Sequence, residues 1–291
     1  MSTPERDEES SGFWSGVGDA MATVGRVVGS GASALGRSAA GAYLAVDRDL
    51  RRQIFQAPLL GLMSIVPRST PRVEASHERD VLLVHGLGGH PSHFMAMQRY
   101  FAHVAGRQTH CADLRRADCL DEMARRLRAR IQELCERRRE GRQGKIDIVA
   151  HSMGGIVARL ALEEVETRQR VATLVTMATP HGGTHLARLA ATPRTLDLRP
   201  RSPVIERLRE QDFWDEPRGP RLVALWSESD TTILPPTSAA WEAAQTHQIP
   251  EFTHLSYLVS PASWRVVARL LRTPVPMVCS HARDEKMSLG L

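Results

Sequence analysis

The sequence predicts an α/β protein in which a mostly parallel central sheet is flanked by helices. From Asp80 onward, short apolar runs alternate with stretches of helical periodicity, and this alternation is typical of βαβ units. The chain has 291 residues, which is enough for one large α/β core and short for two catalytic domains. We therefore expect one α/β domain with appended segments.

The apolar runs predict five strands, and the periodic stretches predict the helices between them. The expected strands are residues 81–84, 108–112, 146–150, 172–177 and 222–226. Helices are expected to begin near Pro91, Asp118, Met153 and Pro261.

The interval 181–220 interrupts this alternation, because about forty residues separate the fourth expected strand from the fifth. Leucines, one valine and one isoleucine are interspersed there with arginines and prolines. Long connections in compact domains are usually functional. We expect a small lid insertion of one or two short amphipathic helices that lie over the functional site.

The two ends of the chain differ in composition from the rest. Residues 1–75 contain a Gly/Ala-rich stretch from Gly12 to Ala45 and end with several prolines, so we expect an N-terminal appendage. The α/β domain is expected at 76–272, and the residues from 273 to 291 have the composition of a loose tail.

Four charged residues of the N-terminal segment recur at helical intervals, namely Asp19, Arg26, Arg37 and Arg48. On a helix they would form one narrow polar stripe beside a wide, weakly apolar face. Such a face can lie on a lipid surface, so we expect peripheral membrane association through residues 12–66. The glycines of this segment leave two alternatives open, a disordered tail and a helix packed on the core.

The positive charge of the chain does not predict nucleic-acid binding. Lys and Arg number 38 against 33 Asp and Glu, and ten arginines lie between Arg115 and Arg142 together with six carboxylates. Apolar residues recur at helical spacing in the same stretch, so the arginines are expected on the solvated face of one amphipathic helix. Aromatic residues make up 5% of the chain and offer few platforms for stacking bases.

The cysteines and the N-terminal residues bear on the type of protein and its compartment. The four cysteines show neither the spacing of a zinc site nor the density of a disulfide scaffold, and we expect no metal or other cofactor. The first residues, MSTPERDEESSG, are acidic and polar, and no uninterrupted apolar stretch of about 18 residues follows. We expect a cytoplasmic protein that does not span a membrane.

The most specific motif surrounds Ser152, where the expected strand 146–150 runs directly into small residues and then into a helical pattern. This is the context of a nucleophile elbow, a turn so tight that only small residues fit two positions before and after the nucleophile. Ala150 and Gly154 occupy those positions, so Ser152 is the candidate nucleophile. His151 cannot readily turn its ring onto the neighbouring hydroxyl and is expected to be structural.

Three segments together resemble the bacterial lipase and esterase branch of the α/β-hydrolase superfamily, which includes triacylglycerol lipases. They are the elbow, the run VLLVHGLGG at 81–89 and the run TPHGGT at 179–184. Ala150 departs from the family pattern, which has glycine there. The resemblance covers about residues 80–271 and implies the α/β-hydrolase fold with the chain order nucleophile, acid, histidine.

The resemblance also identifies candidates for the acid and the base. Asp230 lies in a loop after the fifth expected strand, before a short apolar pair and a proline, as in the family's acid loop. Glu228 remains the competing acid. His254 precedes the final helix, where the family keeps its base, and His247 is the other histidine that fits the chain order.

These residues imply a serine hydrolase. His254 would accept the proton of Ser152, and Asp230 would orient the imidazole and stabilise its charged form. In the family pattern, the backbone N–H groups of Leu87 and Met153 would form the oxyanion hole.

The expected function is therefore hydrolysis of carboxylic esters, with lipid acyl esters as substrates, through an acyl-enzyme intermediate. One alternative is an acyltransferase or thioesterase that uses the same acyl-enzyme. Another is a non-catalytic protein that binds membrane surfaces on a hydrolase scaffold.

Overall fold

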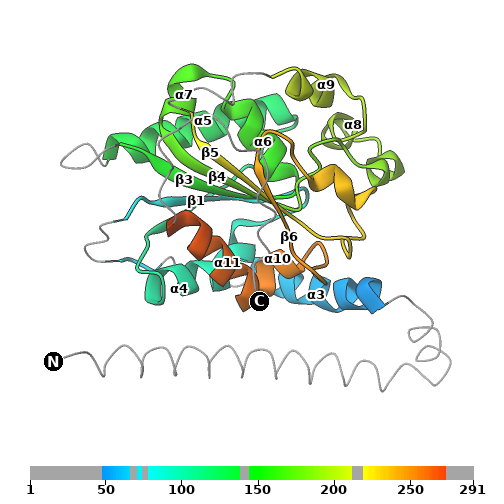
Figure 1. Ribbon diagram of the computed structural model, residues 1–291, viewed down its shortest axis with the longest axis horizontal. Coiled ribbons are helices and arrows are strands. Elements are labelled where there is room, and N and C mark those ends of the chain that lie inside the picture. Colours follow the sequence, from blue (N-terminus) through cyan, green and yellow to red (C-terminus); the bar gives the residue numbers. More distant parts are fainter. Residues whose placement is uncertain (1–47, 66–70, 74–77, 138–143, 212–218, 273–291) are drawn as a thin grey trace.

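The fold is built on a six-stranded sheet in which every neighbouring pair is parallel, in the order β2-β1-β3-β4-β5-β6. The computed structural model describes residues 48–65, 71–73, 78–137, 144–211 and 219–272 (Figure 1). The strands are β1 (Val81–Val84), β2 (Thr109–Ala112), β3 (Ile146–His151), β4 (Val171–Met177), β5 (Arg221–Trp226) and β6 (Gln245–Gln248).

The five predicted strands are confirmed to within one residue at each end. Strands β1, β3 and β4 are buried along their whole length, as parallel strands covered on both faces must be. Strand β6 was not predicted. It lies at the edge of the sheet, and two of its four residues are exposed, so its sequence, QTHQ, contains no apolar run.

Helices cover both faces of the sheet (Figure 1). One core contains side chains of α5 (Leu120–Arg137) and α6 (Met153–Ala161). The other core contains side chains of α4 (Met95–His103), α10 (Ser256–Val259) and α11 (Pro261–Arg272). The 3₁₀ turn η1 (Pro91–Phe94) precedes α4, and the short helix α7 (Val165–Gln169) follows α6. The predicted α/β architecture is thereby confirmed.

The interval 181–220 forms η2 (His185–Leu189), α8 (Pro193–Asp197) and α9 (Pro203–Arg209), and its residues 212–218 lie outside the described residues. A further 3₁₀ turn, η4 (Pro236–Ala239), follows the acid loop. Val204, Ile205 and Leu208 of α9 are buried in the same core as α5 and α6. The apolar side chains of α9 are therefore used in the core.

An 18-residue helix, α3 (Arg48–Ile65), lies within the segment for which the sequence suggests an appendage. Its Leu60 and Met63 are buried in the core that contains α4, α10 and α11. Residues 48–65 therefore pack on the α/β domain, as in one of the alternatives left open above. The rest of the polar stripe, Asp19, Arg26 and Arg37, and the expected tail at 273–291 lie outside the described residues.

Candidate active site

Ser152 lies in a strained turn between β3 and α6. Its φ and ψ angles are 55° and −130°, and its backbone N–H donates to the carbonyl of Met177 at 2.9 Å. A positive φ is uncommon for a residue other than glycine and persists only where surrounding contacts enforce it. The turn directs Ser152 towards the carboxyl ends of the strands, where ligands bind in parallel α/β sheets.

Two positions at the elbow require glycine because other atoms pack closely against them, namely Gly154 in the turn and Gly86 in the loop after β1. A Cβ atom on Gly154 would come within 2.7 Å of the carbonyl oxygens of Val84 and His85. A Cβ atom on Gly86 would lie 2.8 Å from the Cβ atom of Ser152. The end of β1 and its glycine-rich loop thus pack directly on the elbow.

The structure brings the three predicted triad residues together. His254 Nε2 lies 3.0 Å from Ser152 Oγ, and His254 Nδ1 lies 2.9 Å from Asp230 Oδ2. All three side chains are buried, and they come from three segments separated by 78 and 24 residues in the chain. A histidine between a hydroxyl and a carboxylate can accept the hydroxyl proton as it leaves.

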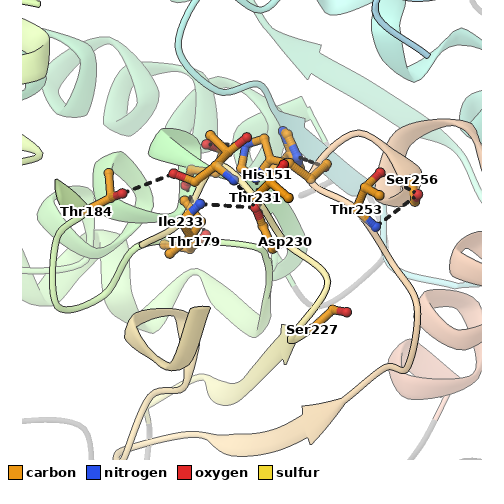
Figure 2. Close-up of polar contacts among 12 residues, drawn as sticks. His151, Thr179, Thr184, Ser227, Asp230, Thr231, Ile233, Thr253 and Ser256 are labelled. Carbon is orange, nitrogen blue, oxygen red and sulfur yellow. Dashed lines mark hydrogen bonds and ion pairs between the residues drawn. The ribbon is translucent and has the colours of Figure 1, made fainter. Parts of the chain in front are cut away.

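Backbone donors hold the carboxylate of Asp230. Its Oδ1 accepts hydrogen bonds from the N–H groups of Thr232 at 2.8 Å and Ile233 at 3.1 Å (Figure 2). Its Oδ2 is then available to accept a hydrogen bond from the N–H at His254 Nδ1. With Nδ1 protonated, Nε2 of the neutral ring presents its lone pair to Ser152, which is the tautomer that a general base requires.

His151 holds the backbone of the candidate base. Its Nε2 lies 2.9 Å from the carbonyl oxygen of His254, so this nitrogen donates and cannot act as a base towards Ser152. Burial lowers the pKa of His151 well below its ordinary value of 6.5, and the ring is therefore neutral near pH 7.

The two competing residues lie elsewhere. Glu228 is exposed, two residues before Asp230. His247 is buried within β6, where it pairs in register with Leu225 of β5. The geometry therefore favours Asp230 and His254 over these alternatives.

His85 shapes the loop that carries the first expected oxyanion donor. Its Nε2 accepts the N–H of Leu114 at 3.2 Å, so the proton lies on Nδ1 and is donated to the carbonyl of Gly86 at 3.0 Å. Leu87 follows directly and is 45% exposed. Met153, the second expected donor, is the first residue of α6, where backbone N–H groups have no partner within the helix.

A cavity of about 310 Å³ opens at Ser152. Its walls come from α3, the loop after β1, η1, the elbow and the segment from His254 to α10. The lining residues are Ala57, Leu60, Gly61, Ser64, His85, Gly86, Leu87, Gly88, Gly89, His93, Phe94, His151, Ser152, His254, Leu255 and Leu258.

Helix α3 contributes four residues to the lining of this cavity, whereas the sequence suggests a lid at 181–220. None of the described residues of that interval lines the cavity. The physical reason is that α9 buries its apolar face against α5 and α6, while α3 turns Leu60 towards the cavity. A second cavity, of about 720 Å³, lies between Leu87 and the start of α8.

A chain of hydrogen bonds joins α3 to η1 at the cavity wall. His93 Nδ1 accepts the N–H of His90 at 3.3 Å, and its Nε2 lies 2.8 Å from Ser64 Oγ, which donates to the carbonyl of Leu60. Burial lowers the pKa of His93 to about 4, so the ring is neutral near pH 7 and donates to Ser64.

Sequence reasoning missed the α3 residues that line the cavity. The apolar spacing of Leu59, Leu60 and Met63 is a helical signal, but Pro58 and Gly61 interrupt it. Nothing in a local pattern indicates which part of the domain such a helix contacts.

The fold agrees with comparisons to known proteins. Residues 81–289 match the model of the alpha/beta hydrolase family. The chain belongs to this family. A search of curated proteins finds no match.

Solved structures with a similar fold include lipases. The mature lipase BlEst2 of Bacillus licheniformis superposes with a TM-score of 0.59 at 18% identity, over 70% of this chain and 96% of that chain. Lipase B of Aspergillus fumigatus superposes with a TM-score of 0.56 at 16% identity, over 72% of this chain and 55% of that chain. Phospholipase PlaB of Legionella pneumophila superposes with a TM-score of 0.56 at 11% identity, over 67% of this chain and 60% of that chain. This chain thus spans little more than half of the last two proteins, and these likenesses establish the fold.

Two further properties concern the described residues alone. They contain no group of three or more His, Cys, Asp or Glu side chains placed to hold a metal ion. Of the helices within them, none combines the length and the apolarity needed to cross a bilayer.

Proposed function

We propose that this protein is a serine hydrolase that cleaves carboxylic esters through an acyl-enzyme intermediate. The observation that carries the proposal is the position of His254, within hydrogen-bond distance of both Ser152 Oγ and Asp230 Oδ2 at the floor of a cavity. The residue types, the tautomer and the order along the chain all suit acyl transfer.

The reaction would proceed in two halves. Ser152 Oγ attacks the ester carbonyl carbon while His254 Nε2 takes its proton, and the N–H groups of Leu87 and Met153 stabilise the oxyanion. Collapse breaks the bond to the alcohol, which takes the proton from His254 and leaves an acyl group on Ser152. Water, deprotonated by His254, then attacks the acyl group; the bond to Ser152 Oγ breaks, His254 returns the proton to Oγ, and the acid is released.

We further propose that the substrates are lipid acyl esters. Leu60, Phe94, Leu255 and Leu258 give the cavity an apolar lining, and 310 Å³ suits a short or medium acyl chain. An acyltransferase or thioesterase would form the same acyl-enzyme. Product analysis with an added alcohol distinguishes hydrolysis from transfer, because a transferase yields a new ester.

The test is turnover of p-nitrophenyl esters, from acetate to palmitate, by wild type and Ser152→Ala. The variant should lose about 10³-fold or more in kcat, since the triad acts as a unit. A fluorophosphonate probe should label wild type at Ser152. Folded wild-type protein that neither turns over esters nor reacts with the probe would support the non-catalytic alternative instead.

We also propose that the expected membrane association of residues 12–66 involves the outer face of α3. Ile54, Leu62 and Ile65 of this helix are 49%, 49% and 78% exposed, beside a cavity suited to an acyl chain. An exposed apolar face next to such a site suits a lipid surface. Leu62→Glu should reduce cosedimentation with anionic liposomes, whereas Val165→Glu, at a 51% exposed residue of α7, should not.

A further inference from the structure

Helix α3 is hydrogen-bonded to the loop that carries Asp230. The side-chain amide of Gln53 donates from Nε2 to Thr232 Oγ1 at 2.8 Å and accepts at Oε1 from Thr231 Oγ1 at 3.0 Å. These threonines directly follow Asp230, and the N–H of Thr232 also donates to the Asp230 carboxylate. One glutamine therefore contacts the two residues that follow Asp230, of which Thr232 also holds its carboxylate.

The same helix is hydrogen-bonded to the loop that carries His254. Gln56 accepts at Oε1 from Thr253 Oγ1 at 2.9 Å and donates from Nε2 to Ser256 Oγ at 3.1 Å. Thr253 and Ser256 are bonded to each other at 2.9 Å and lie on either side of His254 in the chain (Figure 2). Gln56 thus completes a polar cluster around the base.

Gln53 and Gln56 are three residues apart, so they lie on one side of the helix. A single rigid element therefore connects the acid loop and the base loop, which are otherwise separate connections after β5 and β6. Catalytic groups must be held within about 0.5 Å of the productive geometry by neighbours that are themselves fixed. The two glutamines are placed to do this.

Attachment of α3 does not account for these contacts. Leu60 and Met63 already bury the helix in the core, about one to three turns further along. Each side-chain amide instead donates one hydrogen bond and accepts another. All four partner hydroxyls belong to residues within two positions of Asp230 or His254 in the chain.

We propose that Gln53 and Gln56 are positioning residues, which hold Asp230 and His254 in line with Ser152 and act through the flanking threonines. This inference rests on the proposed hydrolase activity. It gives the described part of the N-terminal segment a role in catalysis besides any role at a lipid surface.

The test is Gln56→Met, which keeps the length of the side chain and removes both hydrogen bonds. His254 is then less often in line with Ser152, and kcat per active site should fall about 10-fold to 10²-fold, as expected for a displacement near 1 Å. KM for p-nitrophenyl butyrate should change less than threefold, as the order of magnitude expected where substrate contacts are kept. Gln132→Met, at an α5 glutamine bonded to Glu136, is the matched control and should retain the wild-type kcat.

Active sites are counted from the p-nitrophenol burst, so that unfolded protein does not enter kcat. A purely structural role for Gln56 would lower the melting temperature and the number of sites while leaving kcat per site unchanged. Thr253→Val and Thr253→Ser test the same hydrogen bond from its other end, because only serine keeps the hydroxyl that donates to Gln56. Thr253→Ser should retain wild-type kcat, and Thr253→Val should reproduce the loss.

The outcomes separate this inference from the proposed function. Wild-type protein without ester turnover or fluorophosphonate labelling means that the hydrolase proposal has failed. If wild type is active and Gln56→Met has the same kcat per site, the positioning role is wrong. Should Gln56→Met not fold, equal kcat values for Thr253→Val and Thr253→Ser overturn it.

Discussion

Gly61 offers a direct test of where the acyl chain binds. It lies inside α3, lines the cavity at Ser152, and a Cβ atom added to it would meet no atom within 4 Å. The backbone therefore accepts a side chain at this position on the cavity wall. Gly61→Ala should even raise the free energy of unfolding, by about 1 kcal/mol, because glycine is a poor helix former.

Gly61→Phe should shorten the acyl chain that the protein accepts. Each buried methylene contributes about 0.8 kcal/mol, so the four that distinguish an octanoyl from a butyryl ester contribute about 3 kcal/mol, or about 10²-fold in kcat/KM. A phenyl ring at the cavity wall would occupy the space for those methylenes. The ratio of octanoate to butyrate kcat/KM should fall by up to about this factor in the variant.

The assay is kcat/KM for a series of p-nitrophenyl esters with wild type, Gly61→Ala and Gly61→Phe. Acetate should be hydrolysed equally by all three, since its acyl group does not reach the changed wall. An unchanged octanoate to butyrate ratio in Gly61→Phe would refute the reasoning, because the acyl chain would then lie elsewhere.

Three further predictions concern the acid, the elbow and a half-buried histidine. Asp230→Asn should lower kcat about 10²-fold more than Glu228→Gln, because an amide cannot stabilise the imidazolium, and the reverse order in steady-state kinetics would reassign the acid. Gly154→Ala should lower the free energy of unfolding in urea by about 2 kcal/mol, since its Cβ atom would meet the β1 backbone; an unchanged midpoint would contradict this. His93 has its pKa lowered from 6.5 to about 4 in the folded protein, so the unfolded chain takes up the proton first as the pH falls. Wild type should therefore lose more thermal stability than His93→Gln between pH 7 and pH 5, and parallel melting curves would show that His93 does not contribute.

Most of the sheet could be predicted because burial on both faces restricts its inner strands to mostly apolar residues. Strands β1, β3 and β4 are buried on both faces, so their sequences are mostly apolar. Strand β6 is at an edge, where polar side chains are tolerated, and it has no such signal. The lid prediction was based on the length of the 181–220 interval. Length alone does not indicate whether the apolar side chains of such an interval face the core or the cavity.

The residues of the candidate site and their order along the chain could be predicted from the sequence. The residues that hold them in place could not. Strand, turn and small neighbours identify Ser152 locally, and the resemblance to lipases and esterases supplies the candidates Asp230 and His254. Gln53 and Gln56 carry no local signal, because their partners are 178 to 200 residues away. Only the folded chain brings a helix that precedes β1 against loops that follow β5 and β6.

The attachment of α3 has a consequence for biosynthesis. Ser256, one of the partners of Gln56, is made 200 residues after it, which takes a ribosome about 10–40 s at about 5–20 residues per second. Throughout that time the helix has emerged while the loops it contacts do not yet exist, and Leu60 and Met63 await part of their core. The nascent chain therefore cannot assemble the candidate site until residues 230–256 have been synthesised, although α3 was made long before.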